Sequence, residues 1–230
     1  NTNKIVFDDN RVLYSSHYGG PDYNIVVTGG NNSAYDTTNI TISNNVFAYS
    51  ASEHLHTDPN ISGNPLVLTF TGNVLFGAGD AAVIGVEKAP ASSPTNVIMG
   101  NLSSSLPHPA DYTGTKIYNN YFGRVYHWGG SFGHADGFSF ENAHRGTSIY
   151  NNVFQDIPGS GIIMGCVGPY LDHISVYNNL FINTPTFDDG SNGTLEIIGI
   201  PDCTEGINNI QIYNNTIANP KARVLQLNLW

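Results

Sequence analysis

The chain has 230 residues, of which 40% are hydrophobic, 11% aromatic and only 11% charged, with a formal net charge of −10. Lys and Arg together number eight, which argues against nucleic acid and anionic membrane surfaces as partners, because both require clustered positive charge. No apolar run approaches the roughly 18 residues that a membrane helix needs, so we expect no membrane insertion.

The first 14 residues, NTNKIVFDDNRVLY, alternate between apolar and polar side chains as a β-strand does. They contain neither an initiator Met nor a signal peptide, so we expect the sequence to be a portion of a longer chain. The last residues, RVLQLNLW, read as a core strand without a polar cap. Uncapped strands at both ends predict either a longer chain or end-to-end self-association.

The segment EHLHTD, residues 53–58, holds the first cluster of titratable side chains. On a strand, His54 and His56 would share a face and bind a metal ion together with Asp58. A polar loop between strands explains the same residues, and the spacing is not diagnostic. We therefore expect no metal site and no cofactor, and Ca²⁺ has no specific support in the sequence.

An apolar-x-apolar-Asn-Asn motif recurs at 116–122 (KIYNNYF), 148–154 (SIYNNVF), 175–181 (SVYNNLF) and 211–217 (QIYNNTI), with looser copies at 41–47, 70–76 and 98–104. The copies are spaced by about 19 to 36 residues, an interval typical of solenoids. Their alternation in steps of two indicates strands, and no stretch of ten or more residues has the period of an amphipathic helix.

A second strand-like segment lies between successive motifs, at 81–87, 136–141, 160–165, 193–199 and 222–228. Short strands joined by bends and repeated once per coil describe a parallel β-helix. We therefore expect an all-β fold, a parallel β-helix of about seven to eight coils, forming a single domain over residues 1–230.

The Asn-Asn pairs mark the bend between two sheets, because Asn tolerates left-handed backbone conformations. Stacked from coil to coil, the amides would donate to one another along the solenoid axis and form an asparagine ladder. The residues expected in this ladder are Asn45, Asn73, Asn101, Asn120, Asn152, Asn179 and Asn215.

This pattern resembles the right-handed parallel β-helix superfamily of pectate-lyase-like proteins, most clearly from about residue 95 to 217. The superfamily includes polysaccharide lyases, glycoside hydrolases, uronan epimerases, phage tailspikes and non-catalytic adhesins. The resemblance therefore implies a fold and leaves several functions open.

The least regular segment, Gly123 to Gly146, concentrates residues capable of chemistry on what we expect to be one face of the solenoid. The candidate catalytic residues are Asp136, Glu141, His134, His144 and Arg145, and the candidate substrate-binding residues are Arg124, Tyr126, His127 and Trp128. Alternatively, Asp136 caps a turn and the aromatic residues, with Tyr112 and Tyr121, cover a sheet.

Aligning the coils places Glu87, Glu141 and Glu196 on outward positions of one sheet. Carboxyl groups would be roughly 5 Å apart in neighbouring coils and roughly 10 Å apart in alternate coils. These distances bracket the carboxyl separations of retaining and inverting glycosidases. Solvated surface carboxylates are the alternative. Because so few cations are present, we expect an uncharged glycan rather than a polyanion.

Cys166 and Cys203 leave equivalent strands of neighbouring coils, which predicts a coil-to-coil disulfide in an extracellular protein. Secretion would also make Asn-x-Ser/Thr triplets available for glycosylation. The triplets begin at Asn31, Asn39, Asn60, Asn101, Asn192 and Asn214.

These features predict an extracellular or cell-surface β-helix protein that binds a polysaccharide or other glycan. If it is an enzyme, a lyase or glycoside hydrolase using general acid/base chemistry fits best. The alternative is a non-catalytic structural or adhesive solenoid module of a fibre, tailspike or cell-surface assembly.

Overall fold

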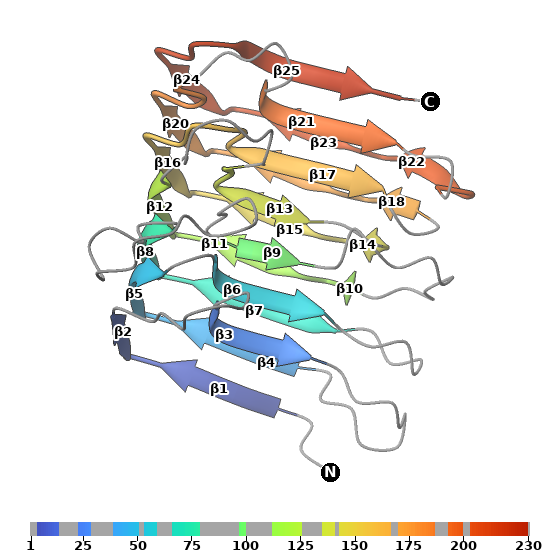
Figure 1. Ribbon diagram of the computed structural model, residues 1–230. Helices are drawn as coiled ribbons and strands as arrows, with labels where there is room; N and C mark the ends of the chain where they lie inside the picture. The colour runs from blue at the N-terminus through green and yellow to red at the C-terminus, as the bar shows by residue number, and fades with distance from the viewer. Residues whose placement is uncertain are drawn as a thin grey trace.

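The computed structural model describes residues 4–13, 23–28, 39–50, 53–58, 66–78, 97–99, 112–125, 135–140, 143–166, 170–186, 193–199 and 203–229. These residues form a parallel β-solenoid, in which every pair of neighbouring strands is parallel (Figure 1). No helix occurs among them. The fold class expected from the repeat is therefore present, as an all-β parallel β-helix.

Three sheets contain seven strands each, so the chain passes each of these walls seven times. Sheet A consists, in spatial order, of β1 (Lys4–Asp8), β4 (Asn39–Ser43), β7 (Val67–Thr71), β11 (Lys116–Tyr118), β15 (Ser148–Tyr150), β19 (Ser175–Tyr177) and β23 (Gln211–Tyr213). Sheet B consists of β2 (Arg11–Leu13), β5 (Val46–Ser50), β8 (Val74–Ala78), β12 (Tyr121–Val125), β16 (Val153–Gln155), β20 (Leu180–Ile182) and β24 (Thr216–Ala218).

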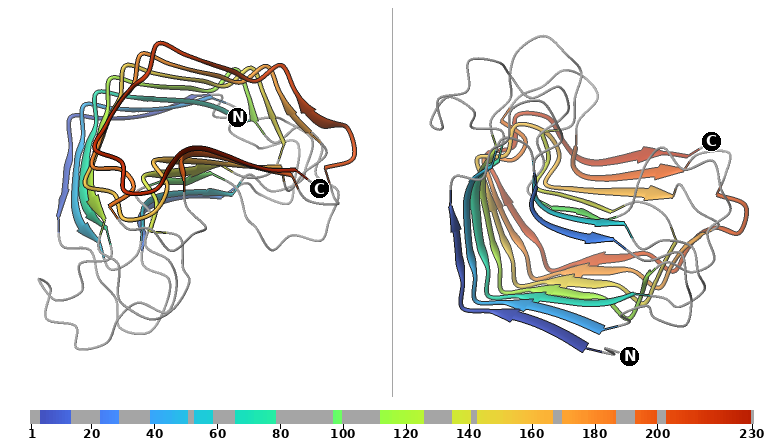
Figure 2. Two further views of the ribbon diagram at one scale, coloured as in Figure 1. Left: turned by 90° about the horizontal axis from the view of Figure 1, so that it is seen from above. Right: turned by 60° about the horizontal axis from the view of Figure 1, so that its bottom comes forward.

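Sheet C consists of β3 (Tyr23–Thr28), β6 (Glu53–Asp58), β9 (Val97–Met99), β13 (Phe138–Phe140), β17 (Ile162–Cys166), β21 (Gly193–Gly199) and β25 (Arg223–Asn228). Sheet D has four strands, β10 (Tyr112–Thr113), β14 (His144–Arg145), β18 (Tyr170–Asp172) and β22 (Gly206–Asn208). Viewed along the axis, sheets A and C lie opposite each other, with sheet B joining them at one side (Figure 2).

Each turn from sheet A to sheet B begins with a residue in the left-handed backbone region. Asn residues fill most of these positions, with φ between 52° and 57° at Asn44, Asn119, Asn151, Asn178 and Asn214. Asp9 and Gly72 occupy the equivalent positions in two other coils. Because Asn, Asp and Gly tolerate this conformation best, the first Asn of each pair sets the direction of the bend.

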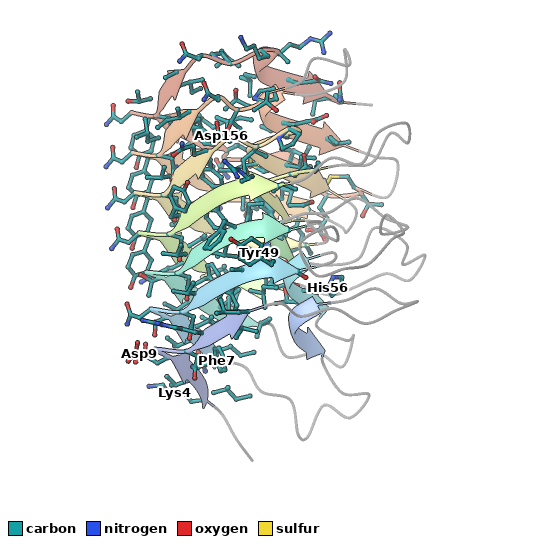
Figure 3. All side chains as sticks on the ribbon, turned by 60° about the vertical axis from the view of Figure 1, so that its left-hand side comes forward. Lys4, Phe7, Asp9, Tyr49, His56 and Asp156 are labelled. Atoms are coloured by element: carbon teal, nitrogen blue, oxygen red, sulfur yellow. A yellow bond between two sulfur atoms is a disulfide. The ribbon has the colours of Figure 1, made fainter. Side chains whose placement is uncertain are left out.

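A second left-handed position recurs three residues after the start of six of the seven sheet B strands, at Tyr49, Gly77, Arg124, Asp156, Asn183 and Asn219. Figure 3 labels Tyr49 and Asp156 at this second bend. The regular recurrence of both bends keeps equivalent residues in register from one coil to the next.

The second Asn of each pair is directed into the protein and bonds to its equivalent in the next coil. In the middle of the chain, Asn120 Nδ2 donates to Asn152 Oδ1, and Asn152 Nδ2 donates to Asn179 Oδ1, both at 3.0 Å. Each amide nitrogen also donates to a backbone carbonyl, such as Ile117 O at 3.0 Å from Asn152. The residues in this asparagine stack are Asn10, Asn45, Asn73, Asn120, Asn152, Asn179 and Asn215.

The series of amides differs from the expected one at two positions. Asn10 is an additional member that the Asn-Asn motif does not predict, because its coil reads Asp-Asp-Asn-Arg. Asn101 lies outside the described residues, and Asn73 Nδ2 donates directly to Asn120 Oδ1 at 3.1 Å. No rung therefore lies between Asn73 and Asn120.

Apolar side chains stack in columns inside the solenoid, on either side of the asparagine stack. On sheet B, Phe122, Phe154 and Phe181 are fully buried, with ring centroids 4.7 and 4.8 Å apart between neighbours. Phe7, labelled in Figure 3, continues the sheet A column at the N-terminal end. Burying such side chains contributes about 1.5–3 kcal/mol each, so these columns supply most of the stability of a coil.

The predicted disulfide is present. Cys166, the last residue of β17, is bonded to Cys203, which follows β21, with the two Cα atoms 5.5 Å apart. Because β17 and β21 are neighbours in sheet C, the bond ties two successive coils together outside the sheet hydrogen bonds.

Replacement of Asn152 by Ala tests the stack. The change removes Asn152 Oδ1, which accepts two hydrogen bonds from Asn120, and Asn152 Nδ2, which donates one each to Ile117 O and Asn179 Oδ1. The buried partners of these atoms lose a hydrogen bond, and an unsatisfied buried group costs about 1–3 kcal/mol. We expect Asn152→Ala to lower the free energy of unfolding by about 3 kcal/mol in urea denaturation. Asn151→Gly is the matched control, since Gly accepts φ of 56°, and equal losses in both variants would contradict the assignment.

Replacement of Cys203 by Ser tests the disulfide. The bond closes a loop with a sequence separation of 37 residues, so its loss should lower the free energy of unfolding by about 2–4 kcal/mol. Under reducing conditions the unchanged protein should unfold at the same urea concentration as Cys203→Ser. If reductant leaves its midpoint unchanged, the disulfide does not contribute.

Candidate functional site

A buried polar cluster joins three successive coils beside sheet C. Asp136 precedes β13, Ser160 precedes β17, and Glu196 lies within β21. Ser160 N donates to Asp136 Oδ1 at 2.6 Å, and Ser160 Oγ donates to Glu196 Oε2 at 3.0 Å. Asn228 Nδ2 of β25 donates to Glu196 Oε1 at 3.1 Å, which extends the cluster into a fourth strand.

Glycines make the approach of these coils possible. A Cβ on Gly159 would lie 2.5 Å from Asp136 Oδ1, and a Cβ on Gly137 would lie 2.7 Å from Gly161 O. Gly-Ser-Gly at 159–161 therefore brings the Ser160 backbone within hydrogen-bonding distance of Asp136. The sequence motifs do not predict a role for Ser160, whose only signal is this pair of flanking glycines.

Both carboxyl groups of the cluster are sealed from solvent, with exposed fractions of 0% for Asp136 and 3% for Glu196. A general acid or base must reach the proton of its substrate within hydrogen-bonding distance. Asp136 instead accepts a backbone hydrogen bond at the entrance of a strand. This geometry supports the turn-capping interpretation of Asp136 rather than the catalytic one.

His144 and Arg145 are neighbours on β14 and lie on opposite sides of sheet D. His144 is fully buried and stacks on Tyr112 with ring centroids 4.3 Å apart and an angle of 5°. Arg145 is on the outer side, with its guanidinium 4.3 Å from the centre of the Tyr170 ring. The two side chains therefore face different environments.

Arg145 belongs to a surface cluster centred on Asp172. Arg145 Nε lies 3.4 Å from Asp172 Oδ2, and His173 Nδ1 and Asn209 Nδ2 lie 2.8 and 3.0 Å from Oδ1. The hydrogen bonds from Asn209 and His173 hold the pKa of the Asp172 carboxyl below its ordinary value, with a smaller contribution from Arg145. The Arg145 and His173 side chains are exposed, so solvent screens these charges and the cluster contributes little to stability.

The remaining candidates of the segment 123–146 are mostly outside the described residues, namely His134, Glu141, Tyr126, His127 and Trp128. Arg124 is described and exposed, at the second left-handed bend. Of the aligned Glu residues, Glu87 also lies outside. In the register of sheet C, the positions level with Glu196 are Ile163 in β17 and Ser139 in β13.

The two histidines of residues 53–58 lie in different environments. His54 is fully buried, with Nε2 3.0 Å from Phe76 O and its ring 6.4 Å from that of Phe47. His56 is half-buried and aligned with Val26 and Ile98 in sheet C. No group of three His, Cys, Asp or Glu side chains within the described residues is arranged to hold a metal ion.

The outer side of sheet A carries a regular array of tyrosines that is separate from the candidate residues above. Tyr118, Tyr150, Tyr177 and Tyr213 stack in one column, with centroids 4.9, 5.0 and 5.0 Å apart and angles of 1° to 3°. Figure 3 shows such columns of side chains repeating from coil to coil. The signal in the sequence is a Tyr directly before the Asn-Asn pair in the four clear copies of the motif. The three looser copies lack this Tyr.

Two polar columns flank these rings, and we call the whole array the tyrosine face. Its members are Lys116, Ser148, Ser175 and Gln211, then Tyr118, Tyr150, Tyr177 and Tyr213, then Asn119, Asn151, Asn178 and Asn214. The four Asn side chains are exposed. Their amides and the four phenol hydroxyls accept or donate no hydrogen bond with any described residue, so they are available to a ligand.

Partial burial, with smaller contributions from neighbouring Tyr118 and Tyr177, raises the pKa of Tyr150 above its ordinary value of 10.0. The Tyr150 hydroxyl therefore stays protonated at neutral pH, so that it can both donate and accept a hydrogen bond.

Two of the six glycosylation triplets have a described Asn. Asn39 begins β4 and Asn214 occupies the turn after β23, and both are exposed. Asn31, Asn60, Asn101 and Asn192 lie outside the described residues.

Comparison of the chain with protein-family models, with curated proteins and with solved structures gives no match. Among the described residues, no helix has the length and apolar character that crossing a membrane requires.

Acid sensitivity tests the placement of His54. Burial lowers the pKa of His54 from 6.5 to about 3, so between these values the unfolded chain binds a proton that the folded chain does not. Stability should therefore fall as pH decreases from about 6.5 toward 3, by at most about 1.4 kcal/mol per pH unit.

Urea denaturation across this pH range provides the measurement. His54→Gln should flatten the dependence, whereas His56→Gln, at the half-buried position, should leave it unchanged. An equal effect of the two variants would contradict the interior position of His54.

Proposed function

We propose that this chain is an extracellular or cell-surface carbohydrate-binding β-helix protein, related to the pectate-lyase-like superfamily, and that the tyrosine face is its binding surface. The observation that carries the proposal is the exposed, coil-repeated set of phenol hydroxyls and amides without partners among the described residues. Sugar hydroxyls both donate and accept hydrogen bonds, and Tyr hydroxyls and Asn amides do the same.

Binding fits the described geometry better than cleavage does. The carboxyl groups of Asp136 and Glu196 are buried, and both are hydrogen-bonded to Ser160. In contrast, the tyrosine face presents groups that recognise a glycan and no carboxylate that would act as an acid or base.

The disulfide supports the proposed location. Disulfides persist in oxidising compartments, and Cys166–Cys203 accounts for both cysteines of the chain. The low content of Lys and Arg supports an uncharged glycan as the partner.

A structural or adhesive solenoid is the second candidate, and the outermost strands favour it. Ile5 and Val6 of β1 and Leu225 and Leu227 of β25 are between 44% and 55% exposed. Stacking on a second copy would cover these side chains, and electron microscopy would then show particles longer than one solenoid.

The glycan proposal is tested with a panel of immobilised polysaccharides, including uncharged glucans, mannans and xylans and charged polygalacturonate. We expect binding to at least one uncharged polymer, weakened about tenfold in the double variant Tyr150→Phe/Tyr177→Phe, because two hydroxyl hydrogen bonds of about 0.5–1.5 kcal/mol each are lost. These changes keep the stacked rings and remove only the oxygens.

Tyr121→Phe is the matched control, since it removes a phenol hydroxyl from the outer side of sheet B. The protein should be made in a host that attaches no N-glycans, because Asn214 begins an Asn-x-Thr triplet within the tyrosine face. Absence of binding to every polymer in the panel would overturn the proposal.

A further inference from the structure

We infer that the tyrosine face binds an extended, uncharged polysaccharide chain lying parallel to the solenoid axis, with about one sugar unit per coil. The inference rests on the proposed function and specifies the orientation, charge and minimum length of the ligand.

The orientation follows from the direction in which the face repeats. Tyr118, Tyr150, Tyr177 and Tyr213 occupy four successive coils with ring centroids 4.9 to 5.0 Å apart. A linear polymer aligned with the axis meets the same hydroxyl and amide at every step. The face repeats every 4.9 to 5.0 Å, so a polymer whose sugar units advance by a similar distance stays in register with the coils over several units.

The mode of contact follows from the stacking of the rings. Neighbouring rings are parallel to within 1° to 3°, so each ring covers the face of the next, and the column presents ring edges and hydroxyls to solvent. A sugar ring therefore cannot stack on a tyrosine face in the middle of the column. Recognition has to come from hydrogen bonds, each of modest strength, and many units must bind together to give a stable complex.

The charge of the ligand follows from the charges on and around the face. Lys116 is the only ionised side chain in the three columns at neutral pH, since Tyr150 stays protonated. The chain as a whole carries a formal charge of −10. A polyanion such as a polyuronate would meet a single cation and net repulsion, whereas an uncharged polymer meets neither.

The length dependence of affinity tests the inference. Isothermal titration calorimetry with β-1,4-linked glucose, mannose and xylose oligomers of two to six units should show affinity rising at least about tenfold from two to four units, as further hydrogen bonds of modest strength form together. The gain should level off beyond about four or five units, since the column has four tyrosines. Galacturonate oligomers of equal length should bind at least about tenfold more weakly, because the face lacks cations.

Variants assign the binding to the face and its axis. Tyr118→Phe and Tyr213→Phe remove hydroxyls at the two ends of the column and should lower the affinity for four-unit oligomers by about threefold or more, with little effect on two-unit oligomers. Tyr121→Phe serves as the control on the neighbouring sheet. Circular dichroism confirms that each variant keeps the fold.

The outcomes separate this inference from the proposed function. Three results would overturn the axial arrangement while carbohydrate binding stands: an affinity independent of oligomer length, galacturonates that bind more tightly than uncharged oligomers, or Tyr118→Phe and Tyr213→Phe variants that bind four-unit oligomers as the unchanged protein does. If neither oligomers nor polysaccharides bind, both are overturned. Rising affinity with length that is lost in the Tyr118→Phe and Tyr213→Phe variants supports both.

Discussion

The fold depends on a turn in which one residue adopts a left-handed backbone and the next buries an amide. At 151–152, Asn151 has φ of 56°, and Asn152 bonds to Asn120, Asn179 and the Ile117 carbonyl. A bend between two sheets places backbone groups in the interior, where they must find partners. The Asn152 side chain supplies such partners, and its own partners are the equivalent Asn residues and backbone groups of the neighbouring coils. This reciprocity explains why the motif repeats, because a coil without an equivalent Asn would leave a buried amide partly unsatisfied in its neighbour.

The parallel β-helix was predictable because the Asn-Asn pairs and the alternation around them are local features that recur. Strand alternation also accounts for Phe138 and Phe140, two residues apart in β13, both of which have no exposed surface. The disulfide was predictable for the same reason, since Cys166 and Cys203 follow equivalent strands. The Asn10 rung was missed because Asp9 takes the place of the first Asn, with φ of 54°. Backbone tolerance, rather than residue identity, determines that position.

Burial of the candidate catalytic residues was harder to predict, because it depends on contacts between coils. His144 looks like a surface histidine in the sequence, yet strand β14 directs it inward onto Tyr112. Asp136 looks like a strand-entrance carboxylate available for chemistry, yet Ser160 reaches it from the next coil. In a solenoid, the neighbours of a residue lie a whole repeat away along the chain. Because the repeats differ in length, the sequence does not show which polar residues of neighbouring coils are in contact.

The same periodicity that satisfies the interior creates the exposed array. Ile149 and Asn152 are directed inward, and the intervening alternation leaves Tyr150 and Asn151 outward in every coil of this type. A column of rings 5.0 Å apart is therefore a consequence of coil stacking, and its stability requires no ligand. Packing between the rings accounts for their parallel stacking. It does not account for the phenol oxygens, which have no hydrogen-bond partner among the described residues. Phe would keep the ring packing at the four Tyr positions, so the phenol oxygens are the feature that packing leaves unexplained, whereas the left-handed backbone already favours Asn at the neighbouring positions.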